Sequence, residues 1–393
     1  MTRSFPTHDF TEFHTRELPG RLAAGNGRRA FTAARGLGAI AFRTPRGEAF
    51  TYVPTDGDIE IRPGDADAAV VVEIEPDDFS ALANDLASGP GLLFPGRIRL
   101  LRGESGRFLA WECGWRALYH GTPVFDPDLV DLRDRSGRPL DTGRSFALDD
   151  DRDEMAHFLA EAGFLHVRSV FDADEVARFR AGAAAARAAA VEGDGNSWWG
   201  VTAAGEKVLT RVLDATFRPE LRGLEADPRL TSLIGLSPAE LEPDMDTGEA
   251  VNVLFKHPDL VEGLGNLPWH RDCGMGGHAL RCPTINLSIF LTPLDPERGG
   301  LWMLPGSAPY AISMGRYADH DPDGAVAVEA GAGDVTLHYG DTLHAAHAPT
   351  GRGEMRESLI VTWRPPDSDP HDGQAHYNDA LKADDGVPIA GRA

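Results

Sequence analysis

A histidine and an aspartate two residues apart, His270 and Asp272, are the pair in this chain best placed to do chemistry. They lie in the segment Pro268-Trp269-His270-Arg271-Asp272. In an extended segment alternate side chains point to the same side, so the imidazole and the carboxylate could bind one metal ion. Arg271 between them would face a substrate channel or point to solvent. Such a pair alone is common in loops and is a weak signal. A metal site also needs a third ligand, which has to come from elsewhere in the chain.

Candidates for the third ligand follow about seventy residues downstream, in and just after the run Gly333 to His344. They are His338, His344 and His347. His338 could instead be a histidine packed inside a sheet, and His347 a loop histidine in solvent. Two histidines and one carboxylate form the facial triad of non-haem iron(II) oxygenases, which leaves positions open for oxygen and a co-substrate.

An anionic dicarboxylate beside the metal would need a fixed cation at its far end. Arginine suits this role because its planar guanidinium forms two parallel hydrogen bonds with a carboxylate. Arg356 is the preferred candidate and Arg352 its nearest rival. On a strand, Ser358 would share the face of Arg356.

Polar and apolar residues alternate in the run TINLSIF, where Thr284 and Asn286 fall on the polar side. A polar face turned toward the metal would orient a co-substrate. A strand that faces solvent has the same pattern, so both interpretations stay open.

The second half of the chain is predicted to be rich in short strands. From Val251 onward the runs VNVLF, PTINLSIFLTPL, LWMLPG, DVTLHYG and SLIVTW are separated by Gly, Pro or Asp turns. Strands without intervening helices indicate an antiparallel sandwich or jelly roll whose strand ends carry the site. Before them, AHFLAEAGFLHVRSVF and DADEVARFRAGAAAARAAAVEG predict two helices, the second starting near Asp172 or Asp174.

Three features occur in one order: the Trp269-His270-x-Asp272 motif, the Gly299-Gly300 turn before LWMLPGS, and the Gly333-Asp334 strand that leads to a second histidine. By these features the chain resembles the phytanoyl-CoA dioxygenase family of iron(II)- and 2-oxoglutarate-dependent oxygenases, over roughly Asp150 to Pro366.

This resemblance implies roles for particular residues. In the family the W-H-x-D motif supplies two metal ligands and the glycine-aspartate strand leads to the third, which places that role on His344. The Arg356-x-Ser358 pattern resembles the family's 2-oxoglutarate anchor. The implied fold is a double-stranded β-helix, a cupin-like jelly roll with flanking helices, preceded by a small α+β domain. The implied cofactors are Fe(II), 2-oxoglutarate and O2.

The first part of the chain carries no such motif. Between about Phe31 and Tyr119 we expect strands at FTYVP, AVVVEIE, RIRLLRG and FLAWEC, and a helix at PDDFSALANDLASG. This pattern resembles the sterol-carrier-protein-2-like lipid-binding domains over roughly the first 140 residues. The charged stretch PDLVDLRDRSGRPLDTGRSFALDDDRDE is the candidate linker. We therefore expect a small α+β domain at 1–145 and the oxygenase domain at 150–393.

Composition excludes several classes of partner. A formal charge of −23 opposes binding to a phosphate backbone, so nucleic acid is not expected. No run is apolar enough for a membrane span. Three cysteines without a CxxC spacing indicate neither disulfides nor a zinc ribbon, and favour a cytoplasmic location. Monomer and dimer stay equally open.

The function that follows is a dioxygenase that hydroxylates, or otherwise oxidises, an unactivated C–H bond of a small or lipid-like molecule, releasing succinate and CO2. Asp272 disfavours halogenation, because related halogenases have a small residue at that position. One alternative is a lipid carrier with a catalytically inactive barrel. Another is a metal-dependent hydrolase or isomerase that uses the same ligands, although the arginine and serine favour the oxygenase.

Overall fold

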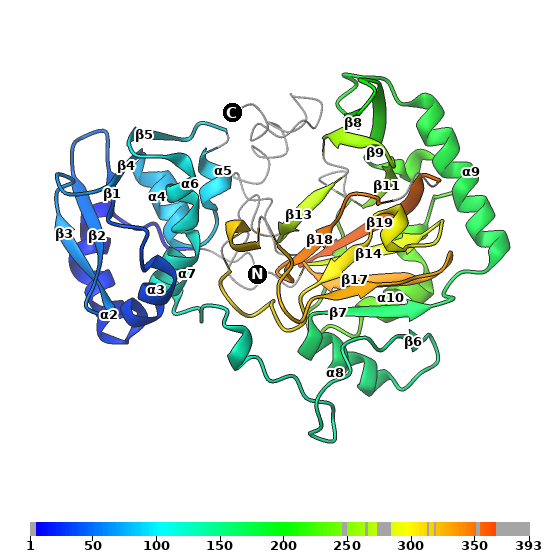
Figure 1. The fold of residues 1–393 in the computed structure, drawn as a ribbon, viewed down its shortest axis with the longest axis horizontal. Helices are drawn as coiled ribbons and strands as arrows, with labels where there is room; N and C mark the ends of the chain where they lie inside the picture. The colour runs from blue at the N-terminus through cyan, green and yellow to red at the C-terminus, as the bar shows by residue number, and fades with distance from the viewer. Residues whose placement is uncertain are drawn as a thin grey trace.

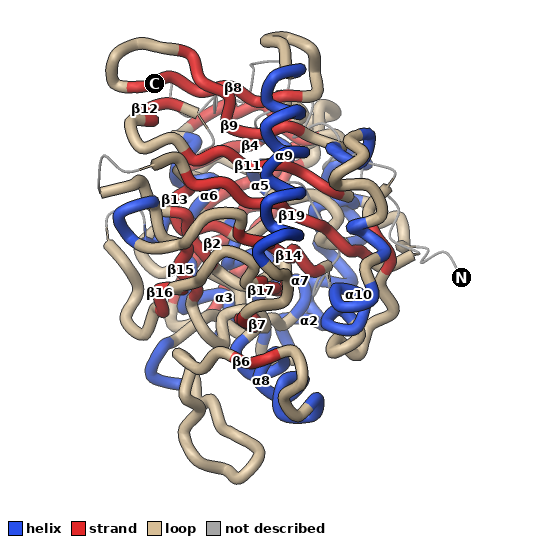
Figure 2. Tube along the Cα trace, turned by 90° about the vertical axis from the view of Figure 1, so that its right-hand side faces the viewer, coloured by secondary structure: helices blue, strands red, loops and turns tan. Residues whose placement is uncertain are grey.

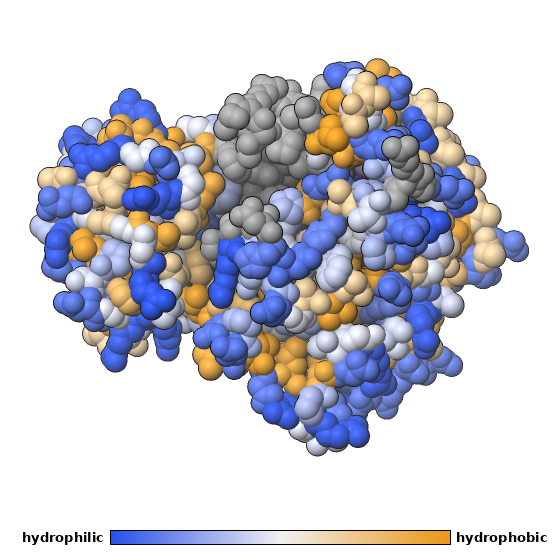
Figure 3. Space-filling view, in the orientation of Figure 1, coloured by the Kyte–Doolittle hydropathy of each residue, from blue (hydrophilic) through white to orange (hydrophobic). Residues whose placement is uncertain are grey.

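The computed structural model describes residues 5–93, 95–245, 250–263, 266–272, 284–312, 314–317, 320–350 and 354–366. Two units, each with its own sheet and apolar core, lie side by side, one blue to cyan and the other green to red in Figure 1. Hydrophilic side chains are spread over both units in Figure 3. In the described part of the chain, no helix has both the length and the apolar character of a membrane span.

The N-terminal unit is a five-stranded sheet with strand order β3-β2-β1-β4-β5, in which β1 and β4 are parallel. The strands are β1 Ile40–Arg43, β2 Ala49–Thr55, β3 Asp58–Pro63, β4 Val70–Ile74 and β5 Ile98–Arg102. The helices are α1 Phe10–Glu12, the π-helix η1 Phe13–Glu17, α2 Leu18–Ala23, α3 Asn26–Ala34, α4 Pro76–Ala83, α5 Gly89–Leu93, α6 Ser105–Ala110 and α7 Glu112–His120.

The strand predicted at FLAWEC is wrong, because this segment lies in helices α6 and α7. Phe108 and Trp111 of this segment and Trp115 just after it recur three and four positions apart and are fully buried. That spacing places all three on one face of a helix, whereas a strand would divide them between its two faces.

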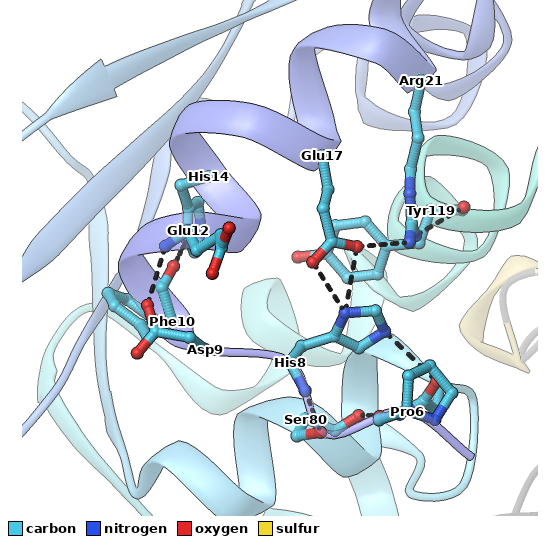
Figure 4. A network of polar contacts seen from close by, with 11 residues as sticks. Pro6, His8, Asp9, Phe10, Glu12, His14, Glu17, Arg21, Ser80 and Tyr119 are labelled. Atoms are coloured by element: carbon cyan, nitrogen blue, oxygen red, sulfur yellow. Dashed lines mark hydrogen bonds and ion pairs between the residues drawn. The ribbon is translucent and has the colours of Figure 1, made fainter. Parts of the chain in front are cut away.

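Polar contacts attach the first helices to the rest of this unit (Figure 4). The backbone N–H of His8 donates to Ser80 Oγ at 2.9 Å, and its ring nitrogen Nδ1 lies 3.0 Å from Glu17. Arg21 donates to the carbonyl of Tyr119 at 2.8 Å. These bonds join the N-terminal segment to α4 and α7, so the first helices are part of this unit.

The C-terminal unit is a jelly roll of a large and a small sheet, as predicted. The large sheet has the order β12-β8-β9-β11-β19-β14-β17-β7-β6, with β10 paired to β19, and the small sheet has the order β13-β18-β15-β16. The strands are β6 Phe146–Ala147, β7 Phe164–Arg168, β8 Ser197–Thr202, β9 Lys207–Val212, β10 Glu242–Pro243, β11 Val251–Lys256, β12 Leu260–Glu262, β13 Leu267–His270, β14 Ile285–Phe290, β15 Leu301–Met303, β16 Val326–Val328, β17 Val335–Tyr339, β18 His344–Ala346 and β19 Arg356–Arg364.

The two faces of the large sheet differ in polarity. On one face Leu287 of β14 pairs with Leu337 and Val361, and this face belongs to an apolar core that includes residues of helices α8 (Arg152–Ala162) and α9 (Ala173–Ala189). Figure 2 shows α9 crossing the strands. On the other face Asn286 pairs with His338 and Thr362. His338 and Ser288 on that face are buried and Asn286 and Thr362 are half-buried, so it is not a fully exposed surface.

The helix predicted over AHFLAEAGFLHVRSVF is correct only in its first part. Helix α8 ends at Ala162, and Gly163 follows with a left-handed φ of 83°. Glycine adopts this conformation without steric cost, so it ends the helix, and the chain continues as strand β7. The start of α9 is confirmed, because Asp172 is its N-cap and forms a capping box with Glu175.

The segment between the units lies on the jelly roll. Phe125 donates its backbone N–H to the carbonyl of Ala311 at 3.0 Å, and its ring joins the apolar cluster of Trp269, Leu343 and Ala345. The N-terminal core therefore gives way to the jelly-roll core near Phe125. The domain division at 145–150 stays a prediction, as does the resemblance of the first unit to lipid-binding domains.

Candidate active site

The small sheet places two histidines opposite each other. Strands β13 and β18 are antiparallel neighbours, and His270 pairs directly with His344. Their neighbours in sequence, Trp269 and Leu343, belong to the apolar cluster that includes Phe125. Because side chains alternate along a strand, the same segments that bury these apolar groups turn both imidazoles to the other side.

Backbone hydrogen bonds orient both imidazoles. Nδ1 of His270 contacts the carbonyl of Pro268 at 2.8 Å, and Nδ1 of His344 contacts the carbonyl of Thr342 at 2.9 Å. An N–H at Nδ1 leaves the lone pair of Nε2 free for a metal. The two Nε2 atoms lie 3.5 and 3.7 Å from Oδ1 of Asp272.

One ligand atom from each of His270, Asp272 and His344 lies within 4.8 Å of the other two. The structure thus brings together the three residues that the sequence predicts as ligands. The rival His347 lies outside this group, because its ring stacks on Trp302 and contacts Asp321 at 3.1 Å.

The protonation states of this group suit metal binding. Burial alone would raise the pKa of Asp272, but His344 and the hydrogen bonds from the neighbouring histidines hold that pKa well below its usual range. Burial, reinforced by His270, lowers the pKa of His344 to about 3. A carboxylate and a neutral imidazole are the forms that bind a metal ion.

The second carboxylate oxygen of Asp272 is held by two other side chains. Asn286 donates its amide N–H to Oδ2, and Nε2 of His338 lies 3.2 Å from the same atom. The amide oxygen of Asn286 accepts a hydrogen bond from Thr362 at 2.7 Å. Asn286, predicted as a co-substrate residue, therefore orients the carboxylate, and its direct contact with a co-substrate stays a prediction.

The predicted anchor residues are buried inside the jelly roll. Arg356 begins β19, is 6% exposed, and donates to the carbonyl of Gly299. Burial lowers its pKa to about 10, which leaves the guanidinium charged at neutral pH. Ser358 is buried two residues further along, where strand alternation puts it on the same face. Thr284 is buried just before β14, and its carbonyl accepts a hydrogen bond from Gly340 at 2.9 Å.

The profile of the phytanoyl-CoA dioxygenase (PhyH) family matches residues 159–358, about half of the chain. The chain belongs to this family. No curated protein matches it. The match covers β14, β17, β18 and the start of β19, and it leaves the N-terminal unit outside.

Several solved structures are similar to the chain. The carbocyclase SnoK from nogalamycin biosynthesis is 28% identical, over 57% of this chain and 87% of that one, with a TM-score of 0.44. The epimerase SnoN in complex with Fe3+, alpha ketoglutarate and nogalamycin RO is 23% identical, over 58% and 89%, with a TM-score of 0.45. AviO1 from Streptomyces viridochromogenes Tue57 is 24% identical, over 56% and 98%, with a TM-score of 0.43.

Iron and 2-oxoglutarate are the cofactor and co-substrate of the PhyH family, and the residues present fit both. Two imidazole nitrogens and one carboxylate oxygen are the donor set of a non-haem iron site. Nε of Arg356 has no hydrogen-bond partner, and no acid pairs with this guanidinium, among the residues that the structure describes. A buried cation without an anion fits the far carboxylate of a dicarboxylate.

Two further cations are buried near this PhyH site, and sequence reasoning missed one of them, Lys256. Arg271 is 3% exposed and donates to the carbonyls of Ser307 at 2.9 Å and of Tyr310, so of its two predicted orientations the one toward solvent is wrong. Lys256 ends β11, is also 3% exposed, and pairs with Arg356 across β11 and β19. The only signal for Lys256 was a lysine at the end of the apolar strand VNVLF.

Asp334, in the glycine-aspartate pair typical of this family, has a structural role here. Its carboxylate accepts hydrogen bonds from the backbone of Ser169 at 2.8 Å and of Gly331 at 2.9 Å, and contacts Nε2 of His166 at 2.9 Å. These contacts tie the start of β17 to β7. The pair thus fixes the strand that leads to His344.

Proposed function

We propose that the protein is an iron(II)- and 2-oxoglutarate-dependent dioxygenase that hydroxylates an unactivated C–H bond of a small or lipid-like molecule, with release of succinate and CO2. In this proposal His270, Asp272 and His344 are the iron ligands, and Arg356 binds 2-oxoglutarate. The observation that carries it is the convergence of two Nε2 atoms and one carboxylate oxygen beside a buried polar sheet face.

The residues of the site divide the work among them. Three protein ligands would fill only part of the coordination sphere of a bound iron, which would leave positions for O2 and the co-substrate. When bound, iron, O2 and 2-oxoglutarate supply the oxidation of the C–H bond. Arg356 orients the co-substrate through its far carboxylate, and Ser358 lies beside it. The apolar core behind both sheets excludes water.

We propose that the substrate is a small molecule and that the enzyme acts in the cytoplasm. Support for the location comes from the odd number of cysteines, of which Cys113 is buried and free. The presence of Asp272 supports hydroxylation over halogenation, because its carboxylate takes the position that a halide would need. Desaturation, cyclisation and epimerisation use the same oxidant and remain alternative outcomes of the reaction.

An anaerobic titration tests the metal and co-substrate assignment. Protein with iron(II) is titrated with 2-oxoglutarate while the visible charge-transfer band of the chelate is recorded. We expect a band in the wild type, no band in His344→Ala because a ligand is lost, and at least a tenfold weaker 2-oxoglutarate affinity in Arg356→Ala.

The control for Arg356→Ala is Arg180→Ala. Arg180 belongs to α9 and contacts Glu357, the residue that follows Arg356 in β19. Its affinity should equal that of the wild type. Wild-type protein that contains iron but gives no band would contradict the proposal, and the hydrolase, isomerase or carrier alternatives would replace it. Once a substrate is found, one 18O atom from 18O2 in the product would establish hydroxylation.

A further inference from the structure

Lys256 and Arg356 form a pair of buried cations inside the jelly roll. They are direct partners across the antiparallel strands β11 and β19, so their side chains lie on the same face of the large sheet. Their exposed fractions are 3% and 6%. Arg356 and burial together lower the pKa of Lys256 to about 6, burial being the larger cause. A second positive charge beside the guanidinium is unfavourable in a dry site, so Lys256 is mostly neutral at pH 7 unless an anion compensates both groups.

The head groups of both cations reach the backbone at the end of the small sheet. Nζ of Lys256 donates to the carbonyl of Ala346 at 2.6 Å, two residues after the predicted ligand His344. Arg356 donates to the carbonyl of Gly299. A Cβ on Gly299 would lie 2.4 Å from Cε of Lys256, so the glycine makes room for the lysine. The two cations therefore converge beside the strand that carries a metal ligand.

No acid of the described residues forms an ion pair with either cation. Glu357 turns to the other face and pairs with Arg180 at 3.1 Å, and Asp295 pairs with Arg298. Strand β9, the other neighbour of β11, places a third cation on this face. It is Arg211, which lies opposite Leu254, two residues before Lys256. The backbone carbonyls satisfy one donor of each group but bring no negative charge. A carboxylate from outside the chain would complete the site.

We propose that Lys256 and Arg356 together bind the far carboxylate of the co-substrate, so that the enzyme selects 2-oxo acids that end in a carboxylate. This inference rests on the proposed function and adds a second positioning residue to it. A compact ammonium beside a planar guanidinium offers donors to both carboxylate oxygens from two strands. Binding of the anion also favours the charged lysine, so co-substrate binding takes up a proton at neutral pH.

Two probes separate this role from a purely structural one. Iron-loaded anaerobic protein is titrated with 2-oxoglutarate and with 2-oxopentanoate, in which a methyl group replaces the far carboxylate. We expect Lys256→Met to weaken 2-oxoglutarate binding at least tenfold while leaving 2-oxopentanoate binding and iron content unchanged. Lys207→Met is the matched control, because it removes a lysine from the exposed edge of β9. It should bind both probes as the wild type does.

Calorimetry of 2-oxoglutarate binding at pH 7.5 in buffers of different ionisation enthalpy gives a second readout. The wild type should take up a fraction of a proton, and Lys256→Met should take up less. If Lys256→Met weakens both probes or loses iron, Lys256 only supports β18 through Ala346 and the inference is overturned. Unchanged 2-oxoglutarate affinity overturns it too, with the proposed function intact. A wild type that binds neither probe overturns both.

Discussion

Asp272 presents its two carboxylate oxygens to different partners. Oδ1 faces the Nε2 atoms of His270 and His344, whereas Oδ2 is held by Asn286 and His338. Groups behind a ligand fix its orientation and raise its affinity for a metal. His338 lies outside the group of three ligand atoms, and we expect it to position the carboxylate of Asp272.

Replacement of His338 should weaken metal binding. We expect His338→Phe to lower the affinity for iron(II) or cobalt(II) by about tenfold, because the hydrogen bond to Oδ2 is lost. His338→Gln, which retains an N–H near that position, should recover much of the loss. Metal titration under anaerobic conditions measures both. His320→Phe, at an exposed histidine, is the control, and an affinity of His338→Phe equal to that control would refute the positioning role.

Single glycines decide where elements end in this chain. Gly163 converts α8 into β7, and Gly333 starts the strand that leads to the metal site. Gly333 has a φ of 90°, and a Cβ there would lie 2.2 Å from the carbonyl oxygen of Phe171. That carbonyl belongs to backbone which cannot rotate away, since Phe171 donates its N–H back to Gly333 at 3.1 Å.

Gly333→Ala should destabilise the jelly roll by at least about 2 kcal/mol, because both the left-handed backbone and the contact with Phe171 oppose a side chain. Gly324→Ala is the matched control, since Gly324 also has a positive φ of 81° but has no atom within 4 Å of its Cβ position. It should cost about 1 kcal/mol. Urea unfolding measures the stability of both variants. Equal losses of stability would show that the backbone around Phe171 moves to accept the new methyl group.

Charged residues from both units line one pocket between them. A small pocket is lined by Asp85 and Arg116 of the N-terminal unit and by Arg271 and Asp341 of the jelly roll. Asp85 lies 2.9 Å from Arg116. Burial raises the pKa of Asp85 to about 7, Arg116 lowers it, and Glu112 and Asp341 add to the rise. Arg271 lies between two predicted ligands in the sequence, so this pocket adjoins the segment that carries the predicted metal site.

The raised pKa of Asp85 predicts how stability depends on pH. Between about pH 4, where the unfolded chain loses this proton, and pH 7, the folded state binds more protons, so stability falls as pH rises. In the wild type the free energy of unfolding should fall by an amount on the order of 2 kcal/mol between pH 5 and pH 8, and Asp85→Asn should remove this fall. Urea unfolding at several pH values measures it. Asp128→Asn, at an exposed aspartate, should keep the wild-type slope, and a similar slope in Asp85→Asn would contradict the prediction.

The N-terminal unit also has a core filled by aromatic rings. Phe42, Phe79 and Trp115 are fully buried, and the ring of Phe42 contacts both others, with centroids 5.2 Å from Trp115 and 5.9 Å from Phe79. Tyr52 and Tyr119 share a hydrogen bond of 2.7 Å between their hydroxyl groups. Such packing supports a bracing role for this unit, while a lipid-carrying role stays a prediction.

The sequence alone predicted the jelly roll and the shared face of His270 and Asp272, because alternation within a short strand decides which side chains share a face. The choice of His344 among three histidines came from the resemblance to the PhyH family. It also located the polar face of β14 and the buried arginine of β19. Helix periodicity was visible at Phe108, Trp111 and Trp115, but the apolar run was interpreted as a strand.

Only the tertiary structure showed that His338 and Asn286 hold Asp272, and that Lys256 lies beside Arg356. It also showed that Arg271 is buried and lines a pocket together with residues of the N-terminal unit. Each of these contacts joins residues on different strands or in different units. Strand order and register determine such pairs, and both depend on the packing of the whole sheet rather than on the local pattern of side chains.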